Sequence, residues 1–257
     1  MTLIQVDDTA IPAPAGGIKA FIIHLRRAHD RQPQVQRLAA GLPVPVEVMD
    51  AVDALDLSDA DIDRVYRRHL HRPRYPFALS RSEIACFLSH REAWRSIVDQ
   101  GLDAGLVLED DVALEPGFPA AFAAARACLR PGDLIRFPVQ EGRERGPEVF
   151  AADGLRIIRP NPVGLRMAAQ LIGRDAAGRL LAATERFDRP VDTTAQMSWV
   201  TGLSPLSVEP SGVREISATL GGSTIQRKKR PLLDKLAREI LRPLYRMKVA
   251  ARSRAGG

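Results

Sequence analysis

The sequence has little cysteine, few aromatic residues and no long apolar run. Its two cysteines, Cys86 and Cys128, are too few for a disulfide framework and lie in apolar stretches that are typical of buried thiols. No stretch of about 18 apolar residues occurs, which argues against a membrane-spanning helix. The first residues are acidic and lack the basic start and apolar run of a secretion signal. We therefore expect a globular, cytoplasmic protein.

Motifs of several large enzyme classes are also missing. The chain has no Gly-x-Gly-x-x-Gly and no Walker sequence, so the common dinucleotide and P-loop sites lose support. It has no HExxH, no Gly-x-Ser-x-Gly and no His-x-Glu with Cys-x-x-Cys, which leaves zinc and serine hydrolases without support. What it has is 257 residues, of which 45% are hydrophobic. That length suits one large or two small domains with a sizeable core.

The positive charge is concentrated at one end of the chain. The net charge is +6, yet residues 227–257 hold eleven Lys or Arg and two acidic residues. Residues 1–226 hold 26 basic and 29 acidic residues, and only 5% of the chain is aromatic, so we expect no nucleic-acid binding by the body. We predict a flexible N-terminal extension over 1–17, a folded domain over 18–226 and a basic amphipathic tail over 227–257.

Apolar runs of strand length alternate with helical stretches, which predicts an α/β sheet. Residues 138–150 are expected to form a loop, and residues 191–206 to be irregular. The expected strands are 18–25, 44–49, 105–108, 134–137, 156–158 and 167–172, and the expected helices are 35–40, 58–70, 80–101, 119–129 and 175–184.

The clearest helix begins with a capping box of Ser80 and Glu83, and Gly101 closes it. Glu83, His90 and Trp94 project along one apolar stripe of this helix. The default interpretation of Trp94 is a side chain that packs in the core. His90 is either a core histidine bonded to Glu83 or to backbone, or part of a site, because a polar group on an apolar stripe needs a partner.

Three consecutive carboxylates, Glu109, Asp110 and Asp111, follow the short apolar strand at 105–108. Ligands of open α/β sheets bind at the carboxyl ends of the strands. In an extended chain Glu109 and Asp111 point to one side, where they offer the oxygen ligands that Mg²⁺ or Mn²⁺ prefers. Such an ion can bridge a diphosphate. The alternative is a solvated acidic turn, but the apolar strand that leads into the acids favours a metal.

Other charged residues also suit a site. Arg26, Arg27 and Arg31 follow the first strand, where a phosphate-bearing ligand would bind, although they also fit a solvated charge run. Asp192 follows a proline and a valine in an expected loop. Its carboxylate is either a general base or a surface charge, and spacing does not decide between them.

Several stretches of the chain, taken together and in this order, form a further motif set. They are 22–27 with Asp30 and Arg31, 51–53, 79–90 with Trp94, 108–112, 168–181, 190–192 and 223–225. Together they resemble glycosyltransferase family 25, the enzymes of lipopolysaccharide biosynthesis, over about residues 18–226. The ordered combination of Ser-His-x-x-x-Trp with Glu-Asp-Asp-Val is the specific part. His24 departs from the pattern, because the family usually has Asn there.

The resemblance implies an α/β fold of GT-A type, a nucleotide-sugar-binding fold with a mixed central sheet flanked by helices. It also implies a UDP-sugar donor, most often UDP-galactose, a divalent metal, Mn²⁺ or Mg²⁺, and inversion at the anomeric carbon. Glu109 and Asp111 would hold the metal. Carried over from the family, the donor-binding residues would be Arg26, Arg31, Glu83, Ser89, His90 and Trp94.

We therefore predict an inverting glycosyltransferase that moves a hexose, galactose in the first instance, to a saccharide acceptor of lipopolysaccharide or a related surface glycan. The metal would neutralise charge on the departing nucleoside diphosphate, and Asp192, or else Asp110, would deprotonate the acceptor hydroxyl. The alternatives are another metal-dependent nucleotide transferase or phosphohydrolase, or a non-catalytic binding module whose basic tail grips nucleic acid. A nucleic-acid module gains nothing from three acids at a strand end.

The tail repeats apolar residues at helical spacing, namely Leu233, Leu236, Ile240, Leu244 and Met247. This pattern predicts a basic amphipathic helix that lies on an anionic membrane, at the inner face of the cytoplasmic membrane where a lipid-linked acceptor is made. The alternatives are a helix packed on the protein's own surface, a disordered end, or nucleic-acid binding. On the membrane hypothesis, a chain that ends at Gln226 keeps its activity on soluble acceptors.

Overall fold

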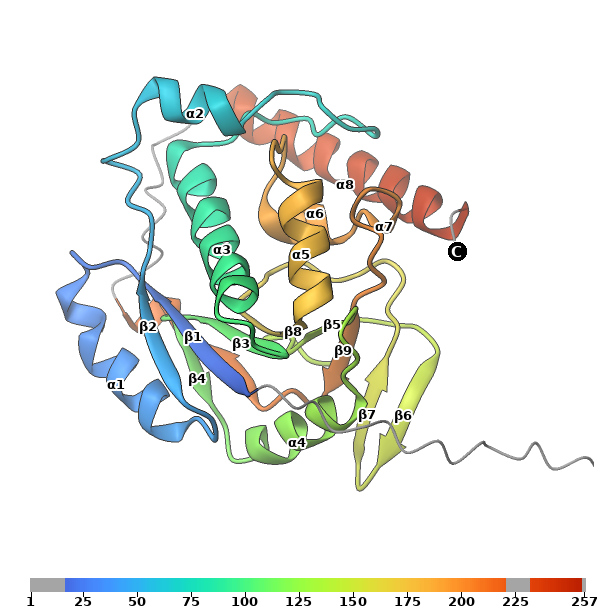
Figure 1. The fold of residues 1–257 in the computed structure, drawn as a ribbon. Coiled ribbons are helices and arrows are strands. Elements are labelled where there is room, and N and C mark those ends of the chain that lie inside the picture. Colours follow the sequence, from blue (N-terminus) through green and yellow to red (C-terminus); the bar gives the residue numbers. More distant parts are fainter. Residues whose placement is uncertain (1–16, 221–231, 256–257) are drawn as a thin grey trace, which may run out of the picture.

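The computed structural model describes residues 17–220 and 232–255, which form three layers around one large sheet (Figure 1). The strand order is β2-β1-β3-β8-β5-β9-β7-β6. These strands are β1 (Ile18–His24), β2 (Val46–Asp50), β3 (Ala104–Glu109), β5 (Leu134–Arg136), β6 (Glu148–Ala152), β7 (Leu155–Ile158), β8 (Ala169–Gly173) and β9 (Leu206–Glu209). β1 is parallel to β2 and β3, whereas β8 is antiparallel to β3 and β5, so the sheet is mixed. A second, two-stranded sheet pairs β4 (Val112–Leu114) with β10 (Val213–Glu215).

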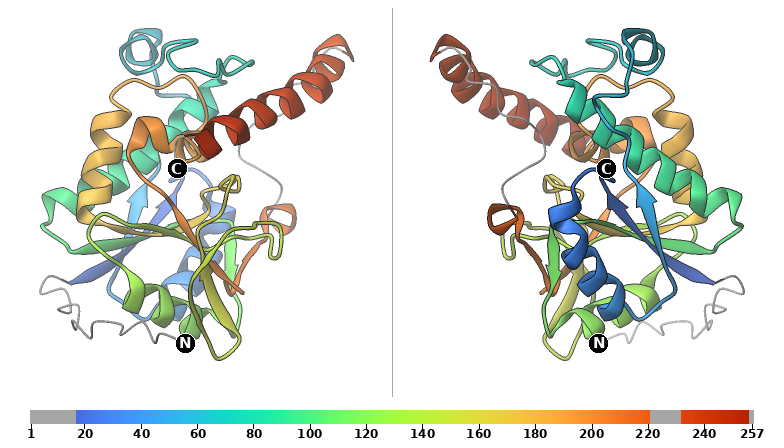
Figure 2. Two further views of the ribbon diagram at one scale, coloured as in Figure 1. Left: turned by 90° about the vertical axis from the view of Figure 1, so that its right-hand side faces the viewer. Right: turned by 90° about the vertical axis from the view of Figure 1, so that its left-hand side faces the viewer.

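Helices cover both faces of the large sheet (Figure 2). One face carries α1 (Gln32–Gly41) and α4 (Phe118–Cys128). The other face carries α3 (Arg81–Asp99), α5 (Arg174–Ala183) and the short α6 (Val191–Ala195). Two further helices, α2 (Asp59–Val65) and α7 (Ser198–Thr201), lie in connecting segments. The predicted α/β architecture, a mixed central sheet flanked by helices, is confirmed, and it is consistent with the GT-A type fold that the resemblance implies.

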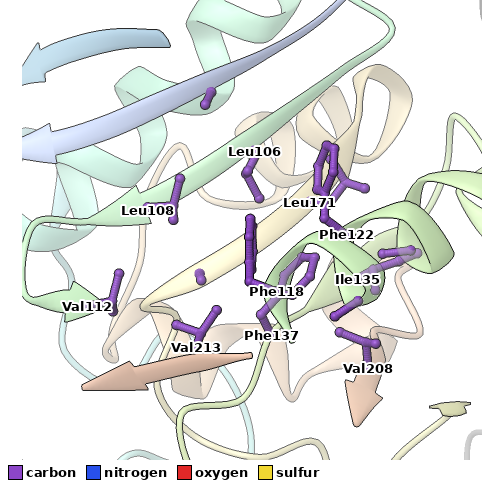
Figure 3. Packing of buried hydrophobic residues seen from close by; sticks show 14 of the residues in the cluster. Leu106, Leu108, Val112, Phe118, Phe122, Ile135, Phe137, Leu171, Val208 and Val213 are labelled. Atoms are coloured by element: carbon purple, nitrogen blue, oxygen red, sulfur yellow. The ribbon is translucent and has the colours of Figure 1, made fainter. Parts of the chain in front are cut away.

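Each face of the sheet has its own apolar core, because successive strand residues point to opposite sides. In β1, Ala20 and Ile22 face one core, while Phe21 and Ile23 face the other. Figure 3 shows the first core, where Phe118 and Phe122 of α4 pack among side chains of β3, β5, β8 and β9. This packing holds β3, the strand that leads into Glu109, Asp110 and Asp111, which we call the acidic triplet.

The second core fixes α3 over the sheet. The predicted capping box is confirmed: Ser80 accepts a hydrogen bond from the backbone N–H of Glu83, and Glu83 accepts one from that of Ser80. Gly105 lets α3 approach closely, since a Cβ there would lie 2.5 Å from the Ile97 side chain. Further along the helix, the Phe87 ring stacks on Phe187 with centroids 3.9 Å apart. The helix therefore has a fixed position above β3.

Three expectations are wrong, the first two because of a long-range contact. The helix expected over 58–70 ends at Val65, since Tyr66 instead forms a β-bridge with Phe187. The loop expected over 138–150 contains the start of β6, which is held by pairing with β7. The segment expected to be irregular over 191–206 contains α6 and α7.

Within the tail, residues Leu232–Ala255 form α8, which lies on the side of the molecule toward which β1 and β2 point (Figure 2). Its packing differs from the predicted stripe: Tyr245 and Val249 are buried against the body, whereas Leu244 and Met247 are exposed. The side chains of Leu233, Leu236 and Ile240, and residues 1–16 of the extension predicted over 1–17, lie outside the described residues. Among the described helices, none is long and apolar enough to cross a membrane.

Candidate active site

The carboxyl ends of β1, β2 and β3 meet at one edge of the sheet, where His24 is aligned with Asp50 and Ile23 with Glu109. Two cavities, of about 130 and 450 Å³, open at this edge. Cys86, Glu109 and Asp111 line both of them. Glu109 and Asp111 therefore lie where the two cavities join.

The smaller cavity lies between the end of β1, the segment 51–54 and α3. The side chain of Ser89 on α3 accepts a hydrogen bond from the backbone N–H of Val52 (2.9 Å) and donates one to the carbonyl of Ala85 (2.9 Å). Arg27 bonds the carboxylate of Asp53, with Nε 2.5 Å from Oδ2. These contacts fix the cavity wall and place one guanidinium in it.

Asp110 points into a buried network rather than into open space. It is only 6% exposed. Its Oδ2 lies 2.7 Å from Nδ1 of His24, and its Oδ1 accepts a hydrogen bond from Nη1 of Arg31 at 2.6 Å. His24, which departs from the family pattern, is thus a direct partner of Asp110. These two contacts hold the Asp110 carboxylate in the wall of the smaller cavity, and it does not line the larger one.

Glu109 is oriented by His90, which is fully buried on α3. Nε2 of Gln170 on β8 donates to Nδ1 of His90 at 3.1 Å. The ring proton then stands on Nε2, which donates to Oε1 of Glu109, also at 3.1 Å. This chain of hydrogen bonds holds the Glu109 carboxylate toward the junction of the cavities.

Asp111 is a carboxyl of the acidic triplet whose pKa is raised by its surroundings. Burial, followed by the negative charges of Glu109 and Asp110, raises the pKa of its carboxyl from 3.8 to about 7. Arg31 acts in the opposite direction, with its Nη1 4.0 Å from Oδ2 of Asp111. Proton uptake or a bound cation would relieve this crowding of negative charge.

Asp192 lies in the wall of the larger cavity, in the first turn of α6. Its Oδ2 accepts a hydrogen bond from the backbone N–H of Arg166 (3.0 Å). Its Oδ1 accepts from the backbone N–H (2.6 Å) and the hydroxyl (3.1 Å) of Thr193. The guanidinium of Arg166 pairs separately with Glu215. Three donors thus fix the Asp192 carboxylate while it faces the cavity.

Not every predicted site residue reaches the cavities. Arg26 is exposed and bonds Asp50, and Trp94 is buried in the second core, so neither lines a cavity. Glu83 lines the larger cavity while capping α3. The predicted residues that the structure brings together are Arg31, Glu83, Ser89, His90, Glu109, Asp110, Asp111 and Asp192.

Some residues of the site were missed from the sequence. Gln170 is fully buried in the middle of an apolar strand, which was an available signal, because such a residue needs a polar partner. Cys86 carried no signal beyond that of a core thiol. The larger cavity is also lined by Arg242, Tyr245 and Arg246 of α8. No local sequence pattern predicts that these residues lie in the cavity wall.

The oxygen ligands suit a hard divalent cation. Glu109 and Asp111 face the same junction, and the raised pKa of Asp111 marks a cluster that lacks positive charge. The ligand atoms of Cys86, His90 and Glu109 also lie within 4.8 Å of one another. Burial and nearby carboxylates, however, raise the pKa of the Cys86 thiol well above its usual value, which keeps it protonated. The carboxylates therefore fit Mn²⁺ or Mg²⁺ better than the thiol fits a soft metal.

Substitutions of His90 and Trp94 are expected to distinguish a residue that acts in the site from one that only packs in the core. Trp94→Ala should destabilise the fold by about 3–5 kcal/mol, because it empties a buried aromatic position. His90→Ala should cost about 1–3 kcal/mol and also lower activity by at least about tenfold, since Glu109 loses its partner. Urea melts and initial rates of both variants measure this. Normal activity of folded His90→Ala would make His90 a core residue only.

Comparison with known proteins identifies relatives of part of the chain. Residues 18–137 match the sequence family described as glycosyltransferase family 25 (LPS biosynthesis protein). Mouse procollagen galactosyltransferase 2 is 27% identical over 189 residues, which are 68% of this chain and 30% of that protein. A glycosyltransferase 25 family member of Drosophila melanogaster is 34% identical, covering 39% of this chain and 17% of that one.

One relative differs in its printed description. The human inactive glycosyltransferase 25 family member 3 is 33% identical, over 42% of this chain and 18% of that one. The chain spans about three tenths of the length of the procollagen galactosyltransferase 2 that it matches. The resemblance to glycosyltransferase family 25 that the sequence motifs indicate is therefore confirmed, and residues 18–137 carry it.

Proposed function

We propose that this chain is a metal-dependent, inverting glycosyltransferase that moves a hexose, galactose in the first instance, from a UDP-sugar to a saccharide hydroxyl. The observation that carries the proposal is the pair of cavities that join at Glu109 and Asp111. A transferase needs two substrates to meet at one point, and the acids stand at that point. The relatives named as galactosyltransferases support the choice of sugar.

The smaller cavity would take the nucleotide of the donor. It lies at the carboxyl ends of parallel strands, where ligands of such sheets bind, and Arg27 and Arg31 line it. Glu109 and Asp111 would hold Mn²⁺ or Mg²⁺, which would offset the charge that develops on the departing nucleoside diphosphate. His90 would keep Glu109 in place, and the Arg31–Asp110–His24 network would keep the acidic turn in place.

Asp192 would be the general base for the acceptor hydroxyl in the larger cavity. Its three hydrogen-bond donors fix the carboxylate and leave lone pairs that face the cavity. Asp110 is the weaker candidate, because it is buried and lines only the smaller cavity, which is assigned to the donor. Removing the hydroxyl proton during attack on the far side of the sugar ring is the step expected of Asp192.

The family description, which concerns lipopolysaccharide biosynthesis, supports one acceptor class. We propose a saccharide of lipopolysaccharide or a related surface glycan, carried on a lipid. The mouse and human relatives are named for procollagen instead. Mass spectrometry of products formed from a panel of nucleotide sugars and Mn²⁺ would identify the donor and acceptor.

Binding of UDP is expected to require a divalent cation. Without one, the diphosphate meets the negative charge of Glu109 and Asp111, so the dissociation constant in EDTA should be at least about tenfold higher than in Mn²⁺. Calorimetry measures both values. Uridine, which lacks the diphosphate, is the matched control and should bind equally in both buffers. Equal affinity for UDP in the two buffers would remove the metal from the proposal.

Attachment to an anionic membrane through α8, at the inner face of the cytoplasmic membrane, is the second part of the proposal. Leu241, Leu244 and Met247 form an exposed apolar strip on α8, next to the exposed Lys248. Apolar side chains that enter the lipid boundary and basic side chains that meet anionic headgroups act together in such helices.

The chain is expected to sediment with anionic vesicles at low salt and to be released as salt screens the charge. The double variant Leu244→Glu with Met247→Glu should reduce vesicle binding by at least about tenfold. Val149→Glu, at an exposed apolar position on β6, is the control. Sedimentation that is the same for the double variant and for the parent chain would remove the membrane from the proposal.

A further inference from the structure

Among its described side chains, helix α8 contacts the body through the buried Tyr245 and Val249, whereas Leu244 and Met247 of the predicted stripe are exposed. The hydroxyl of Tyr245 accepts a hydrogen bond from Nη1 of Arg189 at 2.6 Å, and its ring meets that of Tyr75 edge-on, with centroids 5.3 Å apart. Arg189 is itself fully buried and paired with Asp188. Its position, three residues before Asp192, couples the placement of α8 to that of the cavity wall.

Docked in this way, α8 presents two arginines to the larger cavity. Arg242 and Arg246 are one helical turn apart and line the cavity that Asp192 also lines. The Arg242 guanidinium lies 5.9 Å from the centre of the Phe77 ring. Neither arginine forms an ion pair with any residue in the part of the chain that the structure describes. Arg166, in the same cavity, is by contrast paired with Glu215.

Two guanidinium groups side by side repel each other and attract an anion. Their planar forks match the oxygens of a phosphate or a carboxylate, each through charge-assisted hydrogen bonds. The anion has two sources in a transferase, namely the diphosphate of the donor and an acidic group on the acceptor. Among the described side chains of α8, none lines the smaller cavity. The geometry therefore separates these arginines from the proposed donor side.

We propose that Arg242 and Arg246 form an anion subsite for the acceptor, which would be a saccharide that carries a phosphate or a carboxylate. This inference rests on the proposed function only in assigning the larger cavity to the acceptor. It makes α8 part of the substrate site. It also reverses the expectation that a chain ending at Gln226 keeps its activity, because such a chain lacks both arginines and Tyr245.

The test uses the full chain saturated with UDP and Mn²⁺, so that the donor side is blocked, and measures binding of glucose and glucose 6-phosphate by calorimetry. The parent chain should bind the phosphate sugar at least about tenfold more tightly. Arg242→Gln with Arg246→Gln should abolish this preference, and Arg242→Lys with Arg246→Lys should keep part of it. Lys248→Gln is the matched control, since it removes a charge from α8 outside this cavity, and should keep the full preference. Affinity for UDP should stay within about twofold in every variant.

Three results would overturn the inference. The parent chain could show no preference for the phosphate sugar, or the glutamine pair could retain that preference. The glutamine pair could also lose affinity for UDP by about tenfold, which would assign the arginines to the donor. Thermal melts check folding. If the variant with both glutamines does not fold, the preference for glucose 6-phosphate is compared between the variant with both lysines and the parent chain, and this comparison tests the inference. If no nucleotide sugar gives a product while the arginine-dependent preference stands, the proposed function fails and the anion subsite remains.

Discussion

Asp111→Asn is expected to lose turnover by at least about 100-fold while the cation-free protein becomes more stable above pH 7. The change keeps the size of the side chain and removes one negative charge from the cluster of Glu109, Asp110 and Asp111. The loss and the gain have the same origin. The charge that would hold the cation also repels its neighbours when the cation is absent.

The pH dependence has a definite sign. The pKa of Asp111 is raised from 3.8 to about 7 in the folded chain, so the folded state binds this proton more tightly than the unfolded state. The stability of the parent chain therefore falls as pH rises from about 4 to 7, by at most about 4 kcal/mol. The variant avoids this loss, and we expect it to gain about 1–3 kcal/mol at pH 8 and much less at pH 4.

Urea melts in EDTA at pH 4 and pH 8 measure the gain, and melts with Mn²⁺ supply the control. Added Mn²⁺ should stabilise the parent chain and have a smaller effect on Asp111→Asn, because a ligand that binds only the folded state raises stability by mass action. A variant that transfers sugar at the normal rate would show that the acidic cluster is structural. An unchanged stability at pH 8 would contradict the crowding of charge.

Asp192→Asn is expected to lower kcat by about 100- to 10,000-fold, the range typical for loss of a general base. Affinity for UDP with Mn²⁺ should not change, because Asp192 lines only the larger cavity. The amide retains one oxygen for the backbone N–H of Arg166 or of Thr193, so the stability cost should be only about 1–3 kcal/mol. Single-turnover rates and calorimetry separate these quantities.

Asp175→Asn is the matched control for Asp192→Asn. Asp175 stands in the first turn of α5 as Asp192 stands in the first turn of α6, but it is exposed and lines neither cavity. Both substitutions remove an acid from a helix N-terminus and thus cost similar dipole stabilisation. The control should keep its full rate. Equal losses in the two variants would point to helix stability, and a normal rate for Asp192→Asn would remove the assigned base.

Several features of the fold were predictable because their causes are local. The apolar runs at Ile18–His24 and Ala104–Glu109 form strands, and Ser80 with Glu83 starts α3 as the capping box predicts. Hydrogen bonds of a cap join residues three apart, so short-range pattern is enough to place them. The acids at the end of β3 were identifiable for the same reason, since an apolar strand that ends in carboxylates is visible in five or six residues.

Local sequence patterns were enough to predict the α/β class, the capped helix and the position of the acidic triplet. How the carboxylates are distributed between the two cavities depends on partners far along the chain, so only the folded structure reveals it. Asp110 is bound by His24 and Arg31, about 80 residues away, and lines only the smaller cavity, whereas Asp111 lines both. Helical periodicity defines the faces of α8 but not which face meets the body. The hydrogen bond from the buried guanidinium of Arg189 to the hydroxyl of Tyr245, together with the burial of Val249, defines the face that meets the body, and Arg242 and Arg246 line the larger cavity as a result.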